Sequence, residues 1–499
     1  MDSNQQYLQY KNIVQKIADV KYASAVLQWD QETYLPVKGN IFRGQQIATL
    51  SEMAHEQFID NKVGDLLNDL ADKNDLGHKE KRNVLLSLED YNRSKKFTPA
   101  FIRKLSVAVN KSYHLWIRAR KENSFSVFRN ALHEVIELKR QEADIIGYKA
   151  HPYDALMNDY DKGLTVEITD ALFNSLRPSL SVLLDKIKEQ SPIDNSFLHR
   201  HYEKDKQWEF GIEILKRIGF DFEAGRQDTS EHPFTTNFNN KDVRVTTRIK
   251  ENDFGNMTWS CIHEGGHALY EQGLPEDQYG LPLGEYCSVS IHESQSRLWE
   301  NCIGRGLSFW KHNYPLLREK FPDQLNDIPL EKFYKGINKV HPSLIRTEAD
   351  ELTYHFHVMI RYELEKKLIE GSLATSDIPE YWNEQYFKYL GVKVPDDLNG
   401  CLQDVHWSHG SFGYFATYSI GSLYASQMYA AIKKLTPSLE DEISSGQNQV
   451  VLSWLRQHIY QYGRYYNSGD LCLHATGESL NSQYFITYTT EKFSKIYVS

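Results

Sequence analysis

The chain of 499 residues has a net charge of −10 at pH 7, and 40% of its residues are hydrophobic, enough for a large core. The negative charge and the scattered lysines and arginines argue against nucleic acid as the main partner. No apolar run approaches the length of a membrane span, and the first residues lack the basic and apolar regions of a secretion signal. The five cysteines are odd in number and widely spaced, which favours a reducing compartment over a disulfide framework. These features predict a cytoplasmic protein that acts without a membrane.

Residues 1–230 are predicted to be helical almost throughout. Apolar side chains recur there at helical spacing, which indicates helices that each bury one face in a core. The clearest stripes are Tyr10, Ile13, Val14 and Ile17; Phe128, Ala131, Leu132, Val135 and Ile136, stopping at Gly147; and Leu180, Leu183, Leu184 and Ile187. The expected breaks are Thr98-Pro99, His151-Pro152, Ser191-Pro192 and the segment 221–234.

One stretch has the alternating pattern of a strand. Residues 242–249 alternate apolar side chains with Arg244, Thr246 and Arg248, and residues 234–238 are a suitable hairpin partner. An edge strand in this hairpin could pair with a substrate backbone, and a solvated edge is the alternative. The hairpin leads directly into the motif described next.

The segment 261–273 contains the motif H-E-x-x-H, formed by His263, Glu264 and His267. On a helix, two histidines four residues apart lie on one face and can reach the same metal ion. Glu264 follows the first histidine and can project toward a water molecule held by that ion. Two histidines, a third protein ligand and an open position make a hydrolytic zinc site. Gly273 and Pro275 predict the end of the helix.

The motif leaves two questions open: why it contains two glycines, and which residue is the third metal ligand. Gly265 and Gly266 each cost about 1 kcal/mol relative to alanine inside a helix, so we expect a substrate or a neighbouring strand to approach the bare backbone there. The third ligand is expected to be a carboxylate from a second helix. Spacing alone does not choose among the nearby candidates Glu271, Glu276, Glu285, Glu293 and Glu300.

Six motifs in a fixed order resemble those of the carboxypeptidase Taq family of metallocarboxypeptidases. They are His232-Pro233-Phe234, Asp242-Val243-Arg244-Val245-Thr246, His263 to His267, His292-Glu293-Ser294-Gln295, Ile345-Arg346-Thr347-Glu348-Ala349-Asp350 and Gly400-Cys401-Leu402-Gln403-Asp404-Val405-His406-Trp407. The likeness extends to residues 29–33 and 475–478, so it spans nearly the whole chain. Ala416 departs from the pattern, because a proline is expected at that position.

The resemblance implies a mainly α-helical fold, with a small β-hairpin or sheet beside the metal helix and a deep substrate groove. We expect one domain over residues 1–499, in which 1–230 form a wall or lid of the groove and 231–499 carry the metal site and bind substrate. The family likeness also implies a homodimer that releases single C-terminal residues from peptides with broad specificity.

The resemblance further implies that Glu293 is the third metal ligand. His263, His267 and Glu293 would then hold Zn²⁺, with Co²⁺ or Mn²⁺ as alternatives. Glu264 would act as general base on the water and then pass its proton to the leaving amine. Arginine is the best partner for the substrate's terminal carboxylate. Arg346 is the first candidate and Arg244 the second, and ion pairs with acids such as Asp350 and Asp242 are the structural alternatives.

The remaining candidates support these groups. His406, Tyr414 and Tyr418 are possible donors to the oxyanion of the tetrahedral intermediate. His232 and Asp404 are candidates for orienting the ligand imidazoles. Two rival functions use the same residues: a metallo-oligopeptidase that cuts internally, and a non-catalytic helical scaffold that has kept a structural metal.

Overall fold

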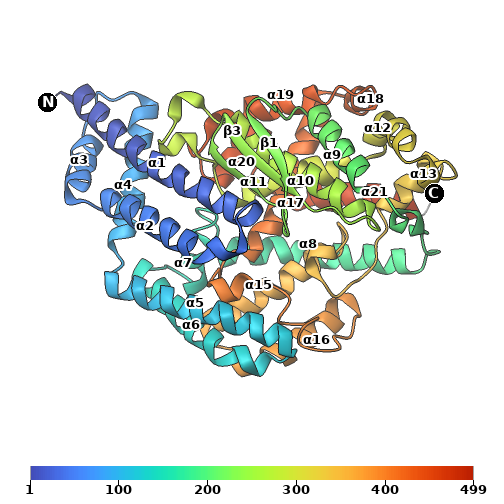
Figure 1. Cartoon of the computed structure of the whole chain (residues 1–499), viewed down its shortest axis with the longest axis horizontal. Coiled ribbons are helices and arrows are strands. Elements are labelled where there is room, and N and C mark those ends of the chain that lie inside the picture. Colours follow the sequence, from blue (N-terminus) through green and yellow to red (C-terminus); the bar gives the residue numbers. More distant parts are fainter. Residues whose placement is uncertain (1, 498–499) are drawn as a thin grey trace. The chain divides into compact units, whose positions relative to one another are not determined.

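The computed structural model describes residues 2–497, which are mainly helical (Figure 1). The chain divides into two compact units, each assembled from three separate segments. The first, called the sheet unit here, comprises Met1–Lys95, Asp194–Ile337 and Tyr424–Ser479. The second, the helical unit, comprises Lys96–Ile193, Asn338–Leu423 and Leu480–Ser499. Each unit contains segments from before and after residue 230. The single domain and the deep groove remain predictions.

The sheet unit contains most of the helices and all the strands of the described residues. Its α-helices are α1 (Ser3–Thr33), α2 (Asn40–Phe58), α3 (Asn61–Ala71), α4 (His78–Lys95), α9 (Lys204–Ile218), α10 (Phe254–Gly273), α11 (Val289–Arg297), α12 (Leu307–Lys320), α13 (Pro322–Leu325), α14 (Leu330–Ile337), α18 (Leu439–Ser444), α19 (Gln449–His458) and α20 (Ser468–Thr476). The predicted apolar stripe of α1 is buried through Tyr10, Val14 and Ile17, and it packs with α3 and α4.

The helical unit contains several long helices and one short helix. They are α5 (Pro99–Glu122), α6 (Phe125–Ile146), the short α7 (Pro152–Met157), α8 (Val166–Lys188), α15 (Tyr354–Glu370), α16 (Ile378–Leu390) and α21 (Gln483–Tyr497), while α17 (Phe415–Leu435) contributes to both units. Ends of α5, α7 and α8 lie at or near predicted breaks. Helix α5 begins after Thr98, whose hydroxyl accepts from the Phe101 amide. Helix α6 ends at Gly147, which has a positive φ of 83°. In the described part of the chain, no helix is both long and apolar enough to cross a bilayer.

The predicted hairpin is confirmed within a sheet that is larger than expected. Strands β2 (Thr235–Asn239) and β3 (Asp242–Thr247) pair antiparallel, and Thr236 lies opposite Arg244. A further strand, β1 (Gly225–Thr229), pairs parallel with β3, so the strand order is β1-β3-β2.

The extra strand, β1, lies in a segment that was predicted to be a break. The strand has no signal in the sequence, because its residues do not alternate between apolar and polar. Its buried residues are the polar Gln227 and Asp228. Strand β3 therefore has a partner on each side and is the centre of the sheet rather than an edge. Its backbone is committed to the sheet, so it is not the strand on which a substrate could add.

Helix α10 begins before the segment predicted for it and ends at Gly273 as expected. It packs closely against α9 and α11, and this packing explains the two glycines of the motif. A Cβ on Gly266 would lie 2.7 Å from the carbonyl oxygen of Gln295 and 2.7 Å from the Cα of Ser296, both on α11. A Cβ on Gly265 would meet side-chain methyl groups of Leu215 and Ile218 on α9. Neighbouring helices, rather than a substrate or a strand, therefore approach the bare backbone.

The Gly266→Ala variant is expected to lower the free energy of unfolding by about 1–3 kcal/mol, the usual cost of overpacking. The added methyl group meets the backbone of α11, which cannot move aside as a side chain can, and α11 carries Glu293. Gly265→Ala is the matched control, because its methyl group meets only the ends of Leu215 and Ile218. Thermal unfolding and bound metal should be measured for both variants. Equal stability of the two would contradict this account.

Candidate active site

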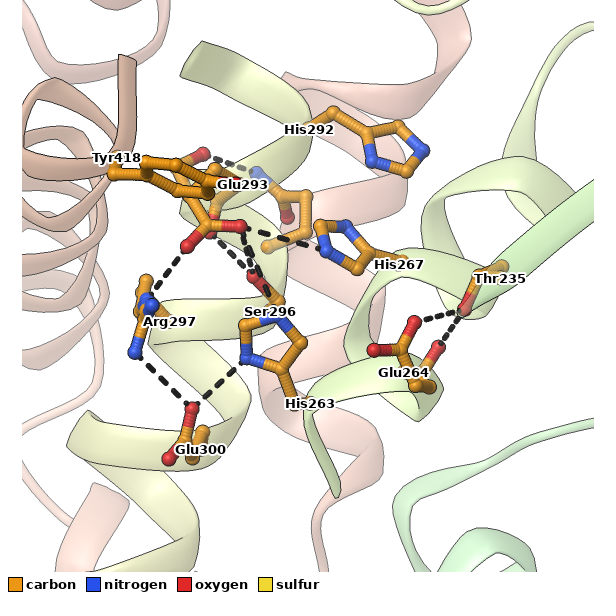
Figure 2. Close-up of polar contacts among 12 residues, drawn as sticks. Thr235, His263, Glu264, His267, His292, Glu293, Ser296, Arg297, Glu300 and Tyr418 are labelled. Carbon is orange, nitrogen blue, oxygen red and sulfur yellow. Dashed lines mark hydrogen bonds and ion pairs between the residues drawn. The ribbon is translucent and has the colours of Figure 1, made fainter. Parts of the chain in front are cut away.

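Helices α10 and α11 bring the three predicted metal ligands together in the sheet unit (Figure 2). His263 and His267 lie one turn apart on α10, and Glu293 lies on α11. The Nε2 atoms of the two histidines are 3.7 and 3.5 Å from Oε2 of Glu293. One ligand atom from each residue falls within 4.8 Å of the others. Two imidazoles and one carboxylate around a common point form a donor set that suits a zinc ion.

The charge states of two members of this cluster, Glu293 and His267, also suit a metal. Glu293 is buried, yet the nearby charges of Arg297 and His263 outweigh burial and hold its pKa well below the usual range. The Nε of Arg297 donates to Oε1 of Glu293 at 2.7 Å, and the Ser296 hydroxyl donates to Oε2 at 3.2 Å. Burial, with the neighbouring His292, lowers the pKa of His267 to about 3. An ionised carboxylate and a neutral imidazole are the forms that bind metal.

Glu300 orients the first histidine from behind. Its Oε2 lies 2.9 Å from Nδ1 of His263, on the opposite side of the ring from the Nε2 that faces Glu293. Arg297 and Arg305 contact the two oxygens of Glu300 at 3.4 and 3.3 Å. Although burial opposes it, the hydrogen bond with His263 and the charge of Arg297 lower the pKa of Glu300 to about 2. A carboxylate in this position fixes the tautomer of a ligand imidazole and raises its basicity.

The second histidine is held by packing instead. The ring of His292 stacks on His267 with centroids 4.4 Å apart. His292 is fixed in turn by Glu271, whose Oε1 lies 2.8 Å from its Nε2 and whose Oε2 accepts from the Asn237 amide. Within residues 2–497, Nδ1 of His267 is buried without a hydrogen-bond partner. The stack thus supplies the orientation that a hydrogen bond supplies to His263.

Glu264 lies beside this cluster and is held by the edge strand β2. Its side chain is buried, with 7% of the residue exposed, and its Oε2 accepts from the Thr235 hydroxyl at 2.7 Å (Figure 2). Burial raises the pKa of Glu264, against the lowering effect of His263 and of the Thr235 bond. A carboxylate with a raised pKa, fixed next to a metal ligand, is suited to accept a proton from water.

A second cluster forms in the helical unit, around Arg346. This residue opens a short 3₁₀ turn (Arg346–Glu348) and is buried, with 6% exposed. Its Nε and Nη2 lie 2.9 and 2.8 Å from Oδ1 of Asp404, and Nη1 donates to the Tyr354 hydroxyl at 3.0 Å. The acid paired with Arg346 is thus Asp404 and not Asp350, whose carboxylate accepts backbone amides of His341, Leu352 and Thr353.

The predicted oxyanion donors belong to the same cluster. Nε2 of His406 and the hydroxyl of Tyr418 are 3.1 Å apart, and the rings of Tyr414 and Tyr418 have centroids 5.1 Å apart. The Arg346 guanidinium lies over the Tyr418 ring at 4.9 Å. Burial and the nearby Arg346 lower the pKa of His406 to about 3, so its imidazole is neutral. The structure therefore gathers four of the predicted substrate-binding residues: Arg346, His406, Tyr414 and Tyr418.

Comparisons with known proteins identify the family of the chain. Residues 9–493 match the family model described as carboxypeptidase Taq (M32) metallopeptidase. The chain belongs to the carboxypeptidase Taq family. Carboxypeptidase 1 of Bacillus subtilis is 36% identical over 98% of both chains. Thermostable carboxypeptidase 1 of Thermus thermophilus is also 36% identical, over 98% of this chain and 99% of that protein.

Solved structures give the same result for the fold. The structure described as "The Structure of CHT" is 56% identical and superposes with a TM-score of 0.97, covering 98% of this chain and 99% of that chain. The M32 carboxypeptidase from Deinococcus radiodurans R1 is 36% identical with a TM-score of 0.97, covering 99% and 100%. The Taq-family chain is therefore a metallocarboxypeptidase with the mainly helical fold that its sequence predicted.

The second candidate for binding the carboxylate, Arg244, lies in the sheet unit of this Taq-family chain. It forms a two-point contact with Asp242, at 2.6 and 3.1 Å, and stacks over Trp29 at 4.8 Å. This is the ion pair named above as its structural alternative. Trp29 lies on α1 and Arg244 on β3, so the contact links α1 to the sheet. Trp29 is also part of the N-terminal segment that resembles the family.

The roles predicted for His232 and Asp404 stay predictions. His232 is exposed in the segment before β2, where its carbonyl oxygen accepts from Ser230. Asp404 holds two arginines within its own unit. Among the described residues, Glu300 is the carboxylate that contacts Nδ1 of a predicted ligand, His263, and the sequence offered it only as a possible ligand.

Some contacts of the Taq-family site had a sequence signal and others did not. Arg297 follows Glu293 by four residues, so both lie on one helix face. Glu300 follows Glu293 by seven residues, which is also a helical spacing, but it lies in a π-helical turn over Leu298–Gly304. Thr235 lies on a separate strand, 29 residues before Glu264. Its bond to Glu264 depends on how β2 packs against α10, which sequence spacing does not reveal.

Proposed function

We propose that the protein is a zinc-dependent carboxypeptidase that releases single residues from the free C-terminus of peptides with broad specificity. The observation that carries the proposal is the convergence of His263, His267 and Glu293 on one point, with buried Glu264 beside them. Only three protein ligands converge there within the described residues, whereas structural zinc sites are usually closed by four. Three ligands would leave a fourth position open for water, which favours catalysis over a scaffold.

Each residue of the metal cluster has a distinct task in this proposal. His263, His267 and Glu293 would hold the Zn²⁺, which would supply the Lewis acidity that activates water and polarises the scissile carbonyl. Glu264 accepts the proton of that water and delivers it to the leaving amine. Thr235 fixes the direction of the Glu264 carboxylate through its hydroxyl. Glu300 and the His292 stack keep the two imidazoles in their orientations. Cobalt and manganese are the alternative metals, and metal analysis of the purified protein decides among the three.

Arg346 is proposed to bind the terminal carboxylate of the substrate. An arginine has five N–H donors, and three nitrogen atoms of Arg346 each make one contact, with Asp404 or Tyr354. One N–H on each terminal nitrogen is therefore left among the described contacts. Two N–H groups on neighbouring nitrogens match the two oxygens of a carboxylate. His406, Tyr414 and Tyr418 are proposed as further contacts to substrate, and no one of them is singled out as the oxyanion donor.

The Arg346→Ala variant should lower kcat/KM on peptides with a free C-terminus by the equivalent of about 3–5 kcal/mol, the cost of removing one partner of a buried charge pair. Activity on matched C-terminally amidated peptides should fall far less, so the preference for the acid should shrink. Arg346→Lys should restore only part of the loss, because an ammonium group lacks the planar fork.

Arg244→Ala is the matched control, since Arg244 also pairs with an aspartate and stacks on an aromatic ring. The measurement is kcat/KM for matched acid and amide peptides, with metal content determined for each variant. Equal slowing of both peptides by Arg346→Ala would contradict the assignment. Loss of the preference in Arg244→Ala alone would transfer the role to the residue on β3.

The rival function is a metallo-oligopeptidase, because the same three ligands serve internal cleavage. An amidated peptide separates the two functions, since only the carboxypeptidase needs a free carboxylate. We further propose that the protein acts as a homodimer in the cytoplasm. The family resemblance supports the dimer. The lack of a disulfide among the five cysteines, all of which lie in residues 2–497, agrees with a reducing compartment. Light scattering of the purified protein would give the oligomeric state.

A further inference from the structure

Two buried arginines of the helical unit share a single carboxylate. Arg346 contacts Oδ1 of Asp404, and the Nε of Arg361 donates to Oδ2 at 2.6 Å. Arg361 lies on α15 and is 0% exposed, so its charge is fully removed from water. It belongs to none of the six motifs of the sequence, and the roles described above do not use it.

The charges of this cluster do not balance. Among the described residues, Asp404 is the only acid in contact with either guanidinium, so two positive groups and one negative group leave +1. The neighbouring histidines add no charge: burial and Arg346 lower the pKa of His406, and burial and Arg361 lower the pKa of His357. Two other acids, Asp350 and Glu365, accept from backbone amides or from the side chains of Tyr153 and Trp407 and contact neither guanidinium. Burial raises the pKa of both carboxyl groups, which reduces the negative charge they add.

The two arginines differ in how fully they are engaged. Arg361 also donates from Nη1 to the His357 carbonyl at 2.8 Å and to the Tyr386 hydroxyl at 3.2 Å, and from Nη2 to Gln403 at 2.7 Å. Four of its five N–H groups are thus committed, counting the bond to Asp404. Arg346 keeps an N–H on each terminal nitrogen, as described above. The unbalanced positive charge can therefore meet an anion at Arg346 and not at Arg361.

This arrangement has a consequence for a carboxylate that approaches Arg346. If Asp404 were paired with Arg346 alone, the pair would be neutral and the aspartate would repel the incoming carboxylate. Arg361 holds the second oxygen of Asp404 and offsets its negative charge. A buried charge without a partner is energetically costly, so binding an anion would lower the free energy of the cluster.

We infer that Arg361 is a positioning residue for substrate recognition: by neutralising Asp404, it leaves the charge of Arg346 available to the C-terminal carboxylate. This inference rests on the proposed function, because it assumes that Arg346 binds that carboxylate. The effect acts on substrate and transition state alike, since both carry the terminal carboxylate. Changing the charge of residue 361 should therefore alter KM more than kcat.

The test compares Arg361→Gln with Arg361→Lys, two polar substitutions that differ in charge. Arg361→Gln should raise KM for an acid peptide by about tenfold or more, the size expected for a unit charge a few ångströms away inside a protein. Its inhibition constant for N-acetyl-phenylalanine should rise in parallel, whereas that for N-acetyl-phenylalaninamide should change little. Arg361→Lys keeps the charge and should retain most of the acid preference. Metal content should equal that of the unmodified protein in both variants.

A double variant makes the charge argument stricter. Arg361→Gln with Asp404→Asn removes one positive and one negative charge, so the cluster returns to +1. Its acid preference should recover relative to Arg361→Gln alone, even though two side chains have changed. If Arg361→Gln does not fold, the acid preference of the double variant is compared with that of the unmodified protein, and its loss would overturn the role of Arg361.

The outcomes separate this inference from the proposed function. An unchanged acid preference in Arg361→Gln, equal losses in Arg361→Gln and Arg361→Lys, or no recovery in the double variant would overturn the role of Arg361. If the unmodified protein shows no preference for acid over amide, or if Arg346→Ala leaves the preference intact, the proposed function itself fails.

Discussion

Replacing Glu264 by glutamine is expected to lower kcat by about 10²- to 10⁴-fold, the contribution of general acid–base catalysis, while metal content and fold are retained. Glutamine has the same shape but cannot accept the proton of the attacking water. Its carbonyl oxygen can still accept the Thr235 hydroxyl that now bonds Oε2, so the local packing should hold. The measurement is kcat and KM on a free-acid peptide, with metal content determined on the same sample.

Glu271→Gln is the matched control for this substitution. Glu271 is also buried on α10, two turns beyond Glu264, but it bonds to His292 and Asn237. Its replacement should reduce turnover far less than that of Glu264. Near-normal turnover in a metal-loaded Glu264→Gln protein would rule out the proposed mechanism.

Loss of the metal is expected when Glu293 is replaced by alanine. The variant removes the one carboxylate that faces both Nε2 atoms, and it leaves Arg297 without the acceptor at 2.7 Å. Removing a group that only orients a ligand costs about 10- to 100-fold in metal affinity, so removing a ligand should cost at least as much. The measurement is zinc affinity by competition with a chelator, which does not depend on catalysis.

Two neighbouring glutamates provide a graded comparison. Glu300→Gln removes the charge behind His263 but leaves the three ligands, so its affinity should fall by about 10- to 100-fold. Glu285→Ala should have no effect on affinity, because Glu285 is half-exposed and pairs with Arg464 at 2.7 Å. If the metal is lost from Glu285→Ala and kept by Glu293→Ala, the ligand assignment is wrong.

Much of the fold could be predicted from periodicity and helix-end signals. The apolar stripes at Tyr10, Phe128 and Leu180 lie on α1, α6 and α8, and Gly147 ends α6. The strand β1 was missed because a strand carrying Gln227 and Asp228 toward the interior has no apolar pattern to detect. The sequence also did not reveal why a glycine is needed at position 266. The backbone that approaches Gly266 belongs to Gln295, which lies on α11, 29 residues later in the chain.

The residues of the site were likewise only partly predictable from the sequence. The spacing of H-E-x-x-H placed His263 and His267 on one helix face, with Glu264 directly after the first histidine, but spacing left five glutamates open for the third ligand. Glu293 was chosen by the family likeness alone, and the structure places it beside both histidines. The Thr235 bond to Glu264 and the Arg361 bond to Asp404 join residues from different elements, so only the folded chain reveals them.

The measurement that tests the central claim most directly is mass spectrometry of a peptide after incubation with the zinc-loaded protein. The account predicts a ladder of products, each shorter by one C-terminal residue, that disappears when the metal is removed by a chelator and when the peptide carries a C-terminal amide. Internal fragments, or an amidated peptide that is shortened as fast as the free acid, would contradict it.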